Sequence, residues 1–430
     1  MTKITDQKWD DVLKGLDRRQ FLVSSMAAGA LTLAPRNVFA QSAEPYNLGV
    51  LLPSTGAGAN WAESAIKAVN IAVADINSRG GLLGKHPINI HYRDTQTKPD
   101  VTTREGRSII LDEKVSAIVG TYSSACALAL QEITHEAKVL QLASISNSAT
   151  ITGANYSPYT YQFGPNTAMM SSAIVVAVDK LARDNGWKNY MTIGQDYEWG
   201  RGIQAGFVNG LKEAYPEANL ERELWFKLGE SDLGAYISGI MSQKPDFVFP
   251  AIAGKDARTF MEQGQAMGML NVTSVVGGQI TTVELQQQKD TLPRGLIGVS
   301  RCAFFAHLEE PTMQKYISMY RDAEGAHPTD MACMNFDVVY GLEQAVEKAG
   351  TIETEAVKNA LKGATLSTGR GTRTFRECDN QLNVPTYIGE VYDDPEFDFP
   401  IYKRDSMIVV DAESVWGTCE AVSANRKQRT

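Results

Sequence analysis

Hydroxyl and amide side chains follow three short apolar runs of this 430-residue chain, at residues 48–52, 116–120 and 139–145. They are Ser54 and Thr55, Ser123 and Ser124, and Asn147, Ser148 and Thr150. In any one loop, capping explains a serine or threonine, because its oxygen accepts from a free backbone N–H at a helix start. Three such loops at one end of a sheet favour an anion site instead. Helix N-termini and neutral donors together suit a carboxylate.

A second group consists of aromatic and amide residues. Trp61 begins a helix after a polar loop, Tyr197 and Trp199 lie in a loop after a predicted strand, and Gln279 follows another strand. A lone tryptophan is usually a core residue. Trp61 and Trp199, however, adjoin polar loops and are placed to cover a ligand from opposite sides. Organic ligands bind in largely apolar pockets with a few polar groups, and this mixture fits that description.

Motifs for catalysis and cofactor binding are not complete in this sequence. The loop from Gly56 to Trp61 begins like a dinucleotide fingerprint, but a tryptophan ring at the third glycine position would block helix–strand packing. Residues 80–86 fail the spacing of a phosphate-binding loop, and there is no G-x-S-x-G turn. The five histidines are scattered singly, which argues against a metal site. We therefore expect no enzyme activity, no cofactor and no metal.

Alternating strands and helices must position these side chains. Residues 46–84 form a strand, a loop and a helix, which Gly80 and Gly81 end. The apolar pattern predicts further strands near 88–92, 116–120, 139–145, 190–194, 220–226, 247–251, 274–276, 296–300, 373–375, 387–391 and 407–410. It predicts further helices at 101–113, 125–137, 167–185, 203–215, 233–242, 256–267, 312–320, 331–349 and 353–361. This order indicates α/β units with parallel sheets, and two lobes between which the chain crosses more than once.

Composition and charge restrict the class of protein. The net charge is −9, which argues against a nucleic-acid surface, because such a surface needs a basic stripe. The length suggests two or three domains, and the 43% hydrophobic content is ordinary for a globular protein.

The N-terminus has the features of an export signal. Arg18 and Arg19 precede an apolar run from Phe21 to Leu33, and small residues ending at Ala40 suit a cleavage site. The arginine pair followed by Phe-Leu resembles a twin-arginine signal. The run is too short to span a bilayer, so we expect residues 41–430 to be a soluble periplasmic protein with no membrane insertion.

The chain has five cysteines, and export into an oxidising compartment permits disulfides. Cys378 and Cys419 are the preferred pair, because both lie in loop-rich C-terminal sequence. Spacing does not determine the pairing, and an odd number leaves at least one thiol free.

The order of several motifs resembles one family: the extracytoplasmic substrate-binding proteins of branched-chain (hydrophobic) amino acid ABC transporters, a type I periplasmic binding protein class. The resemblance lies in residues 48–56, the A-x-x-x-I-N-x-x-G-G-like stretch at 72–84, residues 119–124, 145–150 and 197–200. It covers nearly all of the exported chain. It implies two Rossmann-like lobes joined by a multi-crossing hinge, with residues 41–165 and 303–385 in the first lobe and 166–302 and 386–430 in the second.

The resemblance also implies roles for individual residues. Ser124 matches the serine that holds a ligand carboxylate, and Ser148 and Thr150 match groups that hold carboxylate and ammonium. Trp61 and Trp199 match aromatic residues that cover the ligand from each lobe. The same wall would be lined by Tyr122 and Ser123.

Two positions depart from the family pattern. Gln279 stands where amino-acid binders place an acid for the α-ammonium, and Ala253 stands where they place a tyrosine. Losing a charged hydrogen bond of about 1.5–3 kcal/mol matters for specificity. Two alternatives stay open. Either the ligand lacks an ammonium group, as an organic acid or amide does, or an acid among Asp196, Glu198 and Asp256 replaces the missing one.

The expected function is therefore that of a solute receptor, which captures an amino acid or related small carboxylate and delivers it to ABC transporter permease subunits. The alternative of the same fold is a sensory module for an aromatic or organic acid or an amide. An exported enzyme would need a catalytic set that the sequence does not show.

Overall fold

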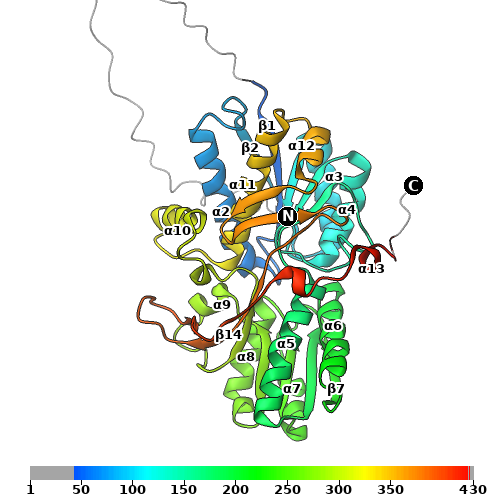
Figure 1. Cartoon of the computed structure of the whole chain (residues 1–430), viewed down its shortest axis with the longest axis vertical. Helices are drawn as coiled ribbons and strands as arrows, with labels where there is room; N and C mark the ends of the chain where they lie inside the picture. Colours follow the sequence, from blue (N-terminus) through cyan, green and yellow to red (C-terminus); the bar gives the residue numbers. More distant parts are fainter. Residues whose placement is uncertain (1–42, 425, 427–430) are drawn as a thin grey trace, which may run out of the picture. The chain divides into compact units, whose positions relative to one another are not determined.

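The computed structural model describes residues 43–424 and 426, and they form two sheets covered by helices (Figure 1). We call each sheet with its helices a lobe. The predicted signal segment, residues 1–40, lies outside the described residues. No helix in the described part of the chain is long and apolar enough to cross a membrane.

The first sheet has eight strands in the order β11-β12-β13-β5-β4-β3-β1-β2. They are β1 (Tyr46–Leu52), β2 (Ile88–Asp94), β3 (Ala117–Gly120), β4 (Leu140–Ala143), β5 (Thr160–Gln162), β11 (Thr365–Thr368), β12 (Gly371–Arg376) and β13 (Gln381–Leu382). The neighbours from β5 to β2 are all parallel. Their carboxyl ends therefore meet at one edge of the sheet.

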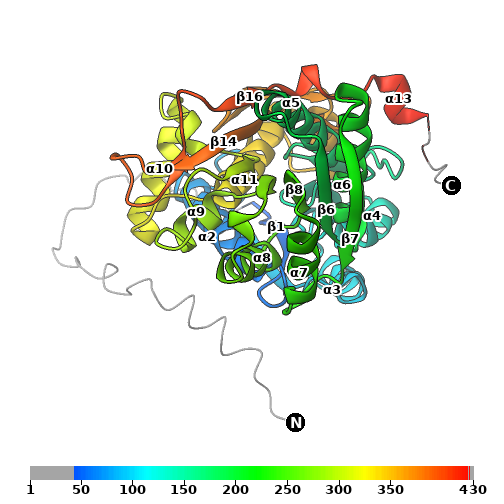
Figure 2. The ribbon, with the colours of Figure 1, turned by 90° about the horizontal axis from the view of Figure 1, so that it is seen from below.

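The second sheet has the order β15-β14-β10-β9-β8-β6-β7, with β16 paired to β14. Its strands are β6 (Asn189–Gln195), β7 (Asn219–Phe226), β8 (Phe247–Ala251), β9 (Ser274–Gln279), β10 (Ile297–Ser300), β14 (Thr386–Tyr392), β15 (Ile401–Tyr402) and β16 (Ile408–Val410). Strands β10, β9, β8, β6 and β7 run parallel, and β14 is antiparallel to β10. Figure 2 shows β6, β7 and β8 side by side.

Helices cover both sheets. Those of the first lobe are α2 (Ala59–Ser78), α3 (Pro99–Asp112), α4 (Ser124–Ala137), α10 (Pro311–Glu324), α11 (Asp330–Ala349) and α12 (Thr354–Leu361). Those of the second are α5 (Thr167–Asn185), α6 (Glu198–Ala214), α7 (Gly234–Gln243), α8 (Lys255–Ala266) and α9 (Thr282–Gln287), and a last helix, α13 (Cys419–Ser423), follows both sheets. Helix α11 packs against α2, and sixteen of its twenty residues are buried. This explains why apolar residues predominate in its sequence.

Most predicted elements are confirmed, with ends shifted by a few residues. The prediction was wrong about α6, which begins at Glu198 rather than Ile203. Gly200 obscured this start because glycine disfavours a helix interior, yet a Cβ there would lie 1.9 Å from the Gln195 carbonyl oxygen. Six short strands or α-helices of the described residues were not predicted: β5, α9, β11, β13, β15 and α13.

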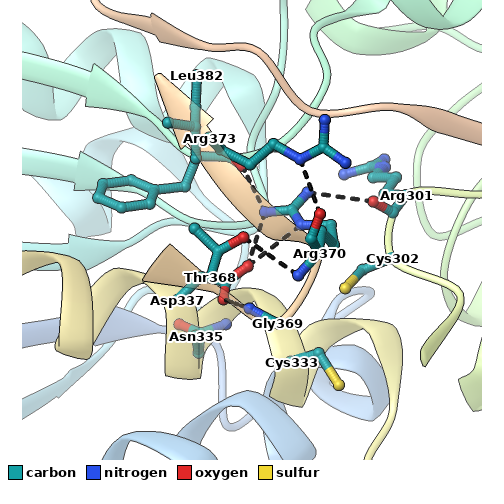
Figure 3. A network of polar contacts seen from close by, with 12 residues as sticks. Arg301, Cys302, Cys333, Asn335, Asp337, Thr368, Gly369, Arg370, Arg373 and Leu382 are labelled. Carbon is teal, nitrogen blue, oxygen red and sulfur yellow. Dashed lines mark hydrogen bonds and ion pairs between the residues drawn. The ribbon is translucent and has the colours of Figure 1, made fainter. Parts of the chain in front are cut away.

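The chain passes between the lobes after β5, after β10 and between β13 and β14. A buried network joins two of these crossings (Figure 3). The guanidinium of Arg370 pairs with Asp337 of α11 at 3.0 Å, and both side chains are fully buried. It also donates to the backbone oxygens of Phe163 at 2.9 Å and Arg301 at 3.3 Å. One side chain thus contacts two of the three crossings.

The predicted disulfide between Cys378 and Cys419 is confirmed, and Cys126, Cys302 and Cys333 are free and buried. The disulfide attaches α13 to the loop between β12 and β13 of the first sheet. The strands of each sheet come from the segments predicted for the corresponding lobe. The C-terminal end, which was predicted for the second lobe, contacts the first lobe instead. The lobe limits themselves stay a prediction.

Candidate functional site

The carboxyl ends of parallel strands in both sheets supply the candidate site. In the first lobe, the segments after β1, β3 and β4 carry Trp61, Tyr122–Ser124 and residues 146–150. In the second lobe, the segments after β6, β8 and β10 carry residues 196–199, Ala253 and Arg301, and Gln279 is the last residue of β9. Ligands of α/β sheets bind at such ends, where loops meet helix N-termini.

Trp61 lies in the first turn of α2 and is fully buried. Its indole Nε1 donates to the Glu284 carboxylate of α9 at 2.7 Å, across the two lobes. Its ring meets Tyr122 edge-on, with ring centres 5.8 Å apart. The tryptophan therefore belongs to a contact between the lobes rather than to the core of one of them.

Tyr122 lies between a glycine of each lobe. A Cβ at Gly58 would lie 2.3 Å from its ring, and a Cβ at Gly254 would lie 2.4 Å from its hydroxyl oxygen. Gly254 also has a φ of +66°, which a side chain would strain. The Tyr122 hydroxyl is buried and has no hydrogen-bond partner within residues 43–424 and 426, and burial holds its pKa well above the ordinary value.

The hydroxyls after β3 and β4 do not cap helices. Ser123 precedes α4 and makes no side-chain capping bond, and the first helix after β4, α5, is capped by Asn166. The Ser124 oxygen instead accepts from the backbone N–H groups of Asn147 at 3.3 Å and Ser148 at 3.1 Å. Ser123 lies beside the Cys126 thiol. Ser124 thus fixes the loop after β4 and keeps its own O–H available to donate.

Ser148 and Thr150 both donate to one carboxylate of the second lobe. Their hydroxyl oxygens lie 2.9 Å and 2.8 Å from Glu198 Oε1, and 2.9 Å from each other. Glu198 is the first residue of α6, so this contact joins the α6 N-terminus to the first lobe. The sequence interpretation named Glu198 only as a possible partner of an ammonium group.

Trp199 and Gln279 have buried polar atoms without partners. Trp199 is 2% exposed, and its indole nitrogen has no partner in the described part of the chain. Its ring centre lies 6.2 Å from that of Tyr197. Gln279, at 3% exposed, has neither amide atom paired among the described residues. Buried polar groups normally have partners, so each such atom is a candidate ligand contact.

Sequence reasoning missed two charged residues of this region, Glu284 and Arg301. Burial raises the pKa of Glu284 to about 7, partly offset by hydrogen bonds from Thr281 and Trp61. Burial lowers the pKa of Arg301 to about 10, so the guanidinium stays charged at neutral pH. The only sequence signal for Arg301 was its place directly after a strand.

Two cavities flank the buried residues. One of about 500 Å³ is lined by both lobes, including Ser148, Thr150, Glu198 and Arg201. The other, of about 170 Å³, lies between α2 and α9 and includes Asn60 and Gln286. In the described part of the chain, no cluster of three His, Cys, Asp or Glu side chains is suited to a metal ion.

The structure brings seven of the eight predicted residues into two groups. The first group consists of Trp61 and Tyr122, whose rings are in contact. The second group lies at the Glu198 end of α6 and consists of Ser123, Ser124, Ser148, Thr150 and Trp199. Gln279 is the last residue of β9, and the neighbouring β10 ends at Ser300, one residue before Arg301. Whether all eight contact a ligand stays a prediction.

This fold and arrangement define a two-lobed binding protein with its polar groups at the facing strand ends. A family model described as periplasmic binding protein matches residues 45–395. The chain therefore belongs to the periplasmic binding protein family and is a solute-binding protein.

Three comparisons illustrate the relationship. The chain is 22% identical over 360 residues to Leu/Ile/Val-binding protein homolog 7 of Brucella abortus, with 81% of this chain and 86% of the relative covered. It resembles an ABC transporter solute-binding protein from R. palustris in complex with benzoate, with TM-score 0.75, 19% identity, and 86% and 96% covered. It also resembles a branched-chain amino acid transporter substrate-binding protein from Streptococcus pneumoniae in complex with isoleucine, with TM-score 0.73, 17% identity, and 85% and 99% covered.

Proposed function

We propose that this chain is the solute-binding receptor of an ABC importer, which closes its lobes on a small carboxylate and delivers it to membrane permease subunits. The observation that carries the proposal is the set of buried, unpartnered polar atoms on facing strand ends, beside Trp61 and Trp199. Such a wall binds a small organic solute by shape and a few hydrogen bonds.

The names of the relatives support an ABC importer and a carboxylate. The solved relatives hold benzoate and isoleucine, both of which carry a carboxylate group. The receptor is placed in the periplasm after export, and the arginine pair at residues 18 and 19 would direct it to the twin-arginine pathway.

The proposed ligand contacts are the eight predicted residues, with Ser124 as a donor to the carboxylate. The proposed first lobe comprises residues 41–165 and 303–385, and the second comprises 166–302 and 386 to about 410. We add residues 411–424 and 426 to the first lobe, because the disulfide and the Arg376 bond to the Gly417 carbonyl attach this segment there.

A thermal-shift screen with amino acids and aromatic acids tests this function. A true ligand at 100 times its Kd should add about 2.7 kcal/mol to the unfolding free energy, because it binds only the folded chain. The variant Ser124→Ala should bind about tenfold more weakly, since two backbone N–H groups lose their acceptor.

The matched control is Ser108→Ala on α3, whose hydroxyl contacts only Asp112 among the bonds described and lies away from the strand ends. It should bind like the unchanged protein. Absence of a shift with every amino acid and organic acid would contradict the proposed function.

A further inference from the structure

Arg301 directly follows the carboxyl end of β10, which is the neighbour of the strand that carries Gln279. Val299 pairs with Gln279 in the parallel β9–β10 ladder, and Arg301 follows two residues later. Its side chain is 2% exposed. The Nη1 group donates to the Ile145 carbonyl of the first lobe at 2.6 Å, and the guanidinium carbon lies 5.4 Å from the Trp61 ring centre. The side chain therefore reaches between the lobes.

This buried cation has no acid partner within ion-pair distance in residues 43–424 and 426, and its Nε–H has no acceptor. The contrast with Arg370 is direct, since that buried arginine pairs with the equally buried Asp337 (Figure 3). Burying a charge without a counterion is costly, and proteins normally pair it. An anion beside Arg301 would remove that cost.

The acids of this region are already held by other groups. Glu284 accepts from Trp61 and Thr281. Asp330 accepts from the backbone N–H of Arg301 and from Thr282, on the other side of the crossing. These two acids influence the guanidinium only at a distance.

The three acids considered for an ammonium group are also engaged. Asp196 pairs with the exposed Arg201 at 2.8 Å. Asp256 accepts from the Gln195 amide and the Gly229 N–H. Glu198 accepts from Ser148 and Thr150. The region thus offers a surplus cation and no free carboxylate for an ammonium group.

We propose that Arg301 receives the carboxylate of the ligand, and that this ligand is an aromatic carboxylate without an α-ammonium group. The inference rests on the proposed function and narrows the ligand class at the same site. The rings of Trp61, Tyr122 and Trp199 provide flat apolar surface. The neutral amide of Gln279 and the indole N–H of Trp199 suit a hydroxyl substituent, which needs no countercharge.

The experiment is calorimetric titration of the purified protein with benzoate, 4-hydroxybenzoate, benzamide and isoleucine. Benzamide keeps the ring and the shape of benzoate but has no charge. We expect the unchanged protein to bind an aromatic carboxylate about 100-fold more tightly than benzamide or isoleucine.

Arg301→Gln should reduce benzoate affinity by about 100-fold while changing benzamide affinity by less than about threefold. Arg301→Lys should fall between, because it keeps the charge but loses the planar pair of donors. Arg321→Gln, on the exposed surface of α10, is the matched control and should bind normally. Circular dichroism checks folding. If Arg301→Gln does not fold, Arg301→Lys decides the question: its affinity for benzoate should fall about tenfold and its affinity for benzamide should not change.

Equal benzoate binding by folded Arg301→Gln and the unchanged protein would overturn the role of Arg301 and leave the proposed function standing. Tighter binding of isoleucine than of either aromatic acid would overturn the ligand class, again without touching the function. If the unchanged protein binds none of the four probes and no other small carboxylate, the proposed function fails and this inference fails with it.

Discussion

At the scale of single residues, Glu284 connects the titration of one carboxyl group to the contact between the lobes. Its side chain is 4% exposed, and it accepts from Trp61 of the other lobe and from Thr281 at the start of its own helix. Burial raises its pKa to about 7 from an ordinary value of 4.5. The folded chain therefore holds a proton at this group that the unfolded chain releases between pH 4.5 and 7.

We predict from this that stability falls as pH rises through that window, by up to about 3 kcal/mol from Glu284 alone, and levels off above pH 7. Urea unfolding of the unchanged protein and of Glu284→Gln at pH 5, 6, 7 and 8 measures it. The glutamine variant should lose less stability between pH 5 and 8, because it cannot ionise. Identical pH dependence in the two proteins would show that Glu284 does not titrate in this range.

The sequence identified the loops of the site but not the partners of each side chain. Hydroxyl and aromatic residues after strands could be recognised because parallel strands bring such loops together. The partner of Trp61 is 223 residues away, and no local pattern announces a contact of that kind. The engagement of Ser148 and Thr150 by Glu198 was missed for the same reason, since it depends on how the lobes meet.

At the scale of elements, the prediction succeeded where a segment is long and its burial regular. Helix α11 and strand β8 are examples, since one has a buried face along its whole length and the other is buried throughout. Strands β13 and β15 have two residues each, too few for any period, and pairing with neighbours defines them. Their positions depend on the assembled sheets and not on local sequence.

The C-terminal element is held mainly by its disulfide. Helix α13 has five residues and no buried side chain, and its cysteine is joined to Cys378, 41 residues earlier. Closing a loop of that length lowers the entropy of the unfolded chain. In the chain-entropy model this raises the unfolding free energy by at most about 4 kcal/mol.

We predict that Cys419→Ser lowers the unfolding free energy by about 2–4 kcal/mol. Thiol titration of the denatured, unreduced protein should find three free thiols in the unchanged chain and four in the variant. As a control, reductant should destabilise the unchanged protein and leave Cys419→Ser unaffected. Five reactive thiols before reduction would rule out the bond.

At the scale of the whole binding protein, a few contacts hold the strand ends of the two lobes together. They include the Trp61–Glu284 bond, the Arg301–Ile145 bond, the Lys255 N–H to the Ala57 oxygen at 3.4 Å, and the two hydroxyl bonds to Glu198. All but the arginine bond join the N-terminal turn of a helix to the opposite lobe. Helix N-termini thus supply several of the polar contacts between the two lobes.

Glu198 allows the closing equilibrium to be tested separately from ligand contacts. Removing its carboxylate in Glu198→Ala deletes two hydrogen bonds across the lobes, each worth about 0.5–1.5 kcal/mol net, so the open state should gain population. We predict a larger radius of gyration by small-angle scattering without ligand. We also predict about 5- to 30-fold weaker binding of the carboxylate found in the screen, because the ligand must then supply the lost closing energy.

Glu213→Ala, an exposed change on the same helix, should alter neither the radius of gyration nor the ligand affinity. Tighter binding by Glu198→Ala would mean that this carboxylate competes with the ligand for Ser148 and Thr150 instead of holding the lobes closed.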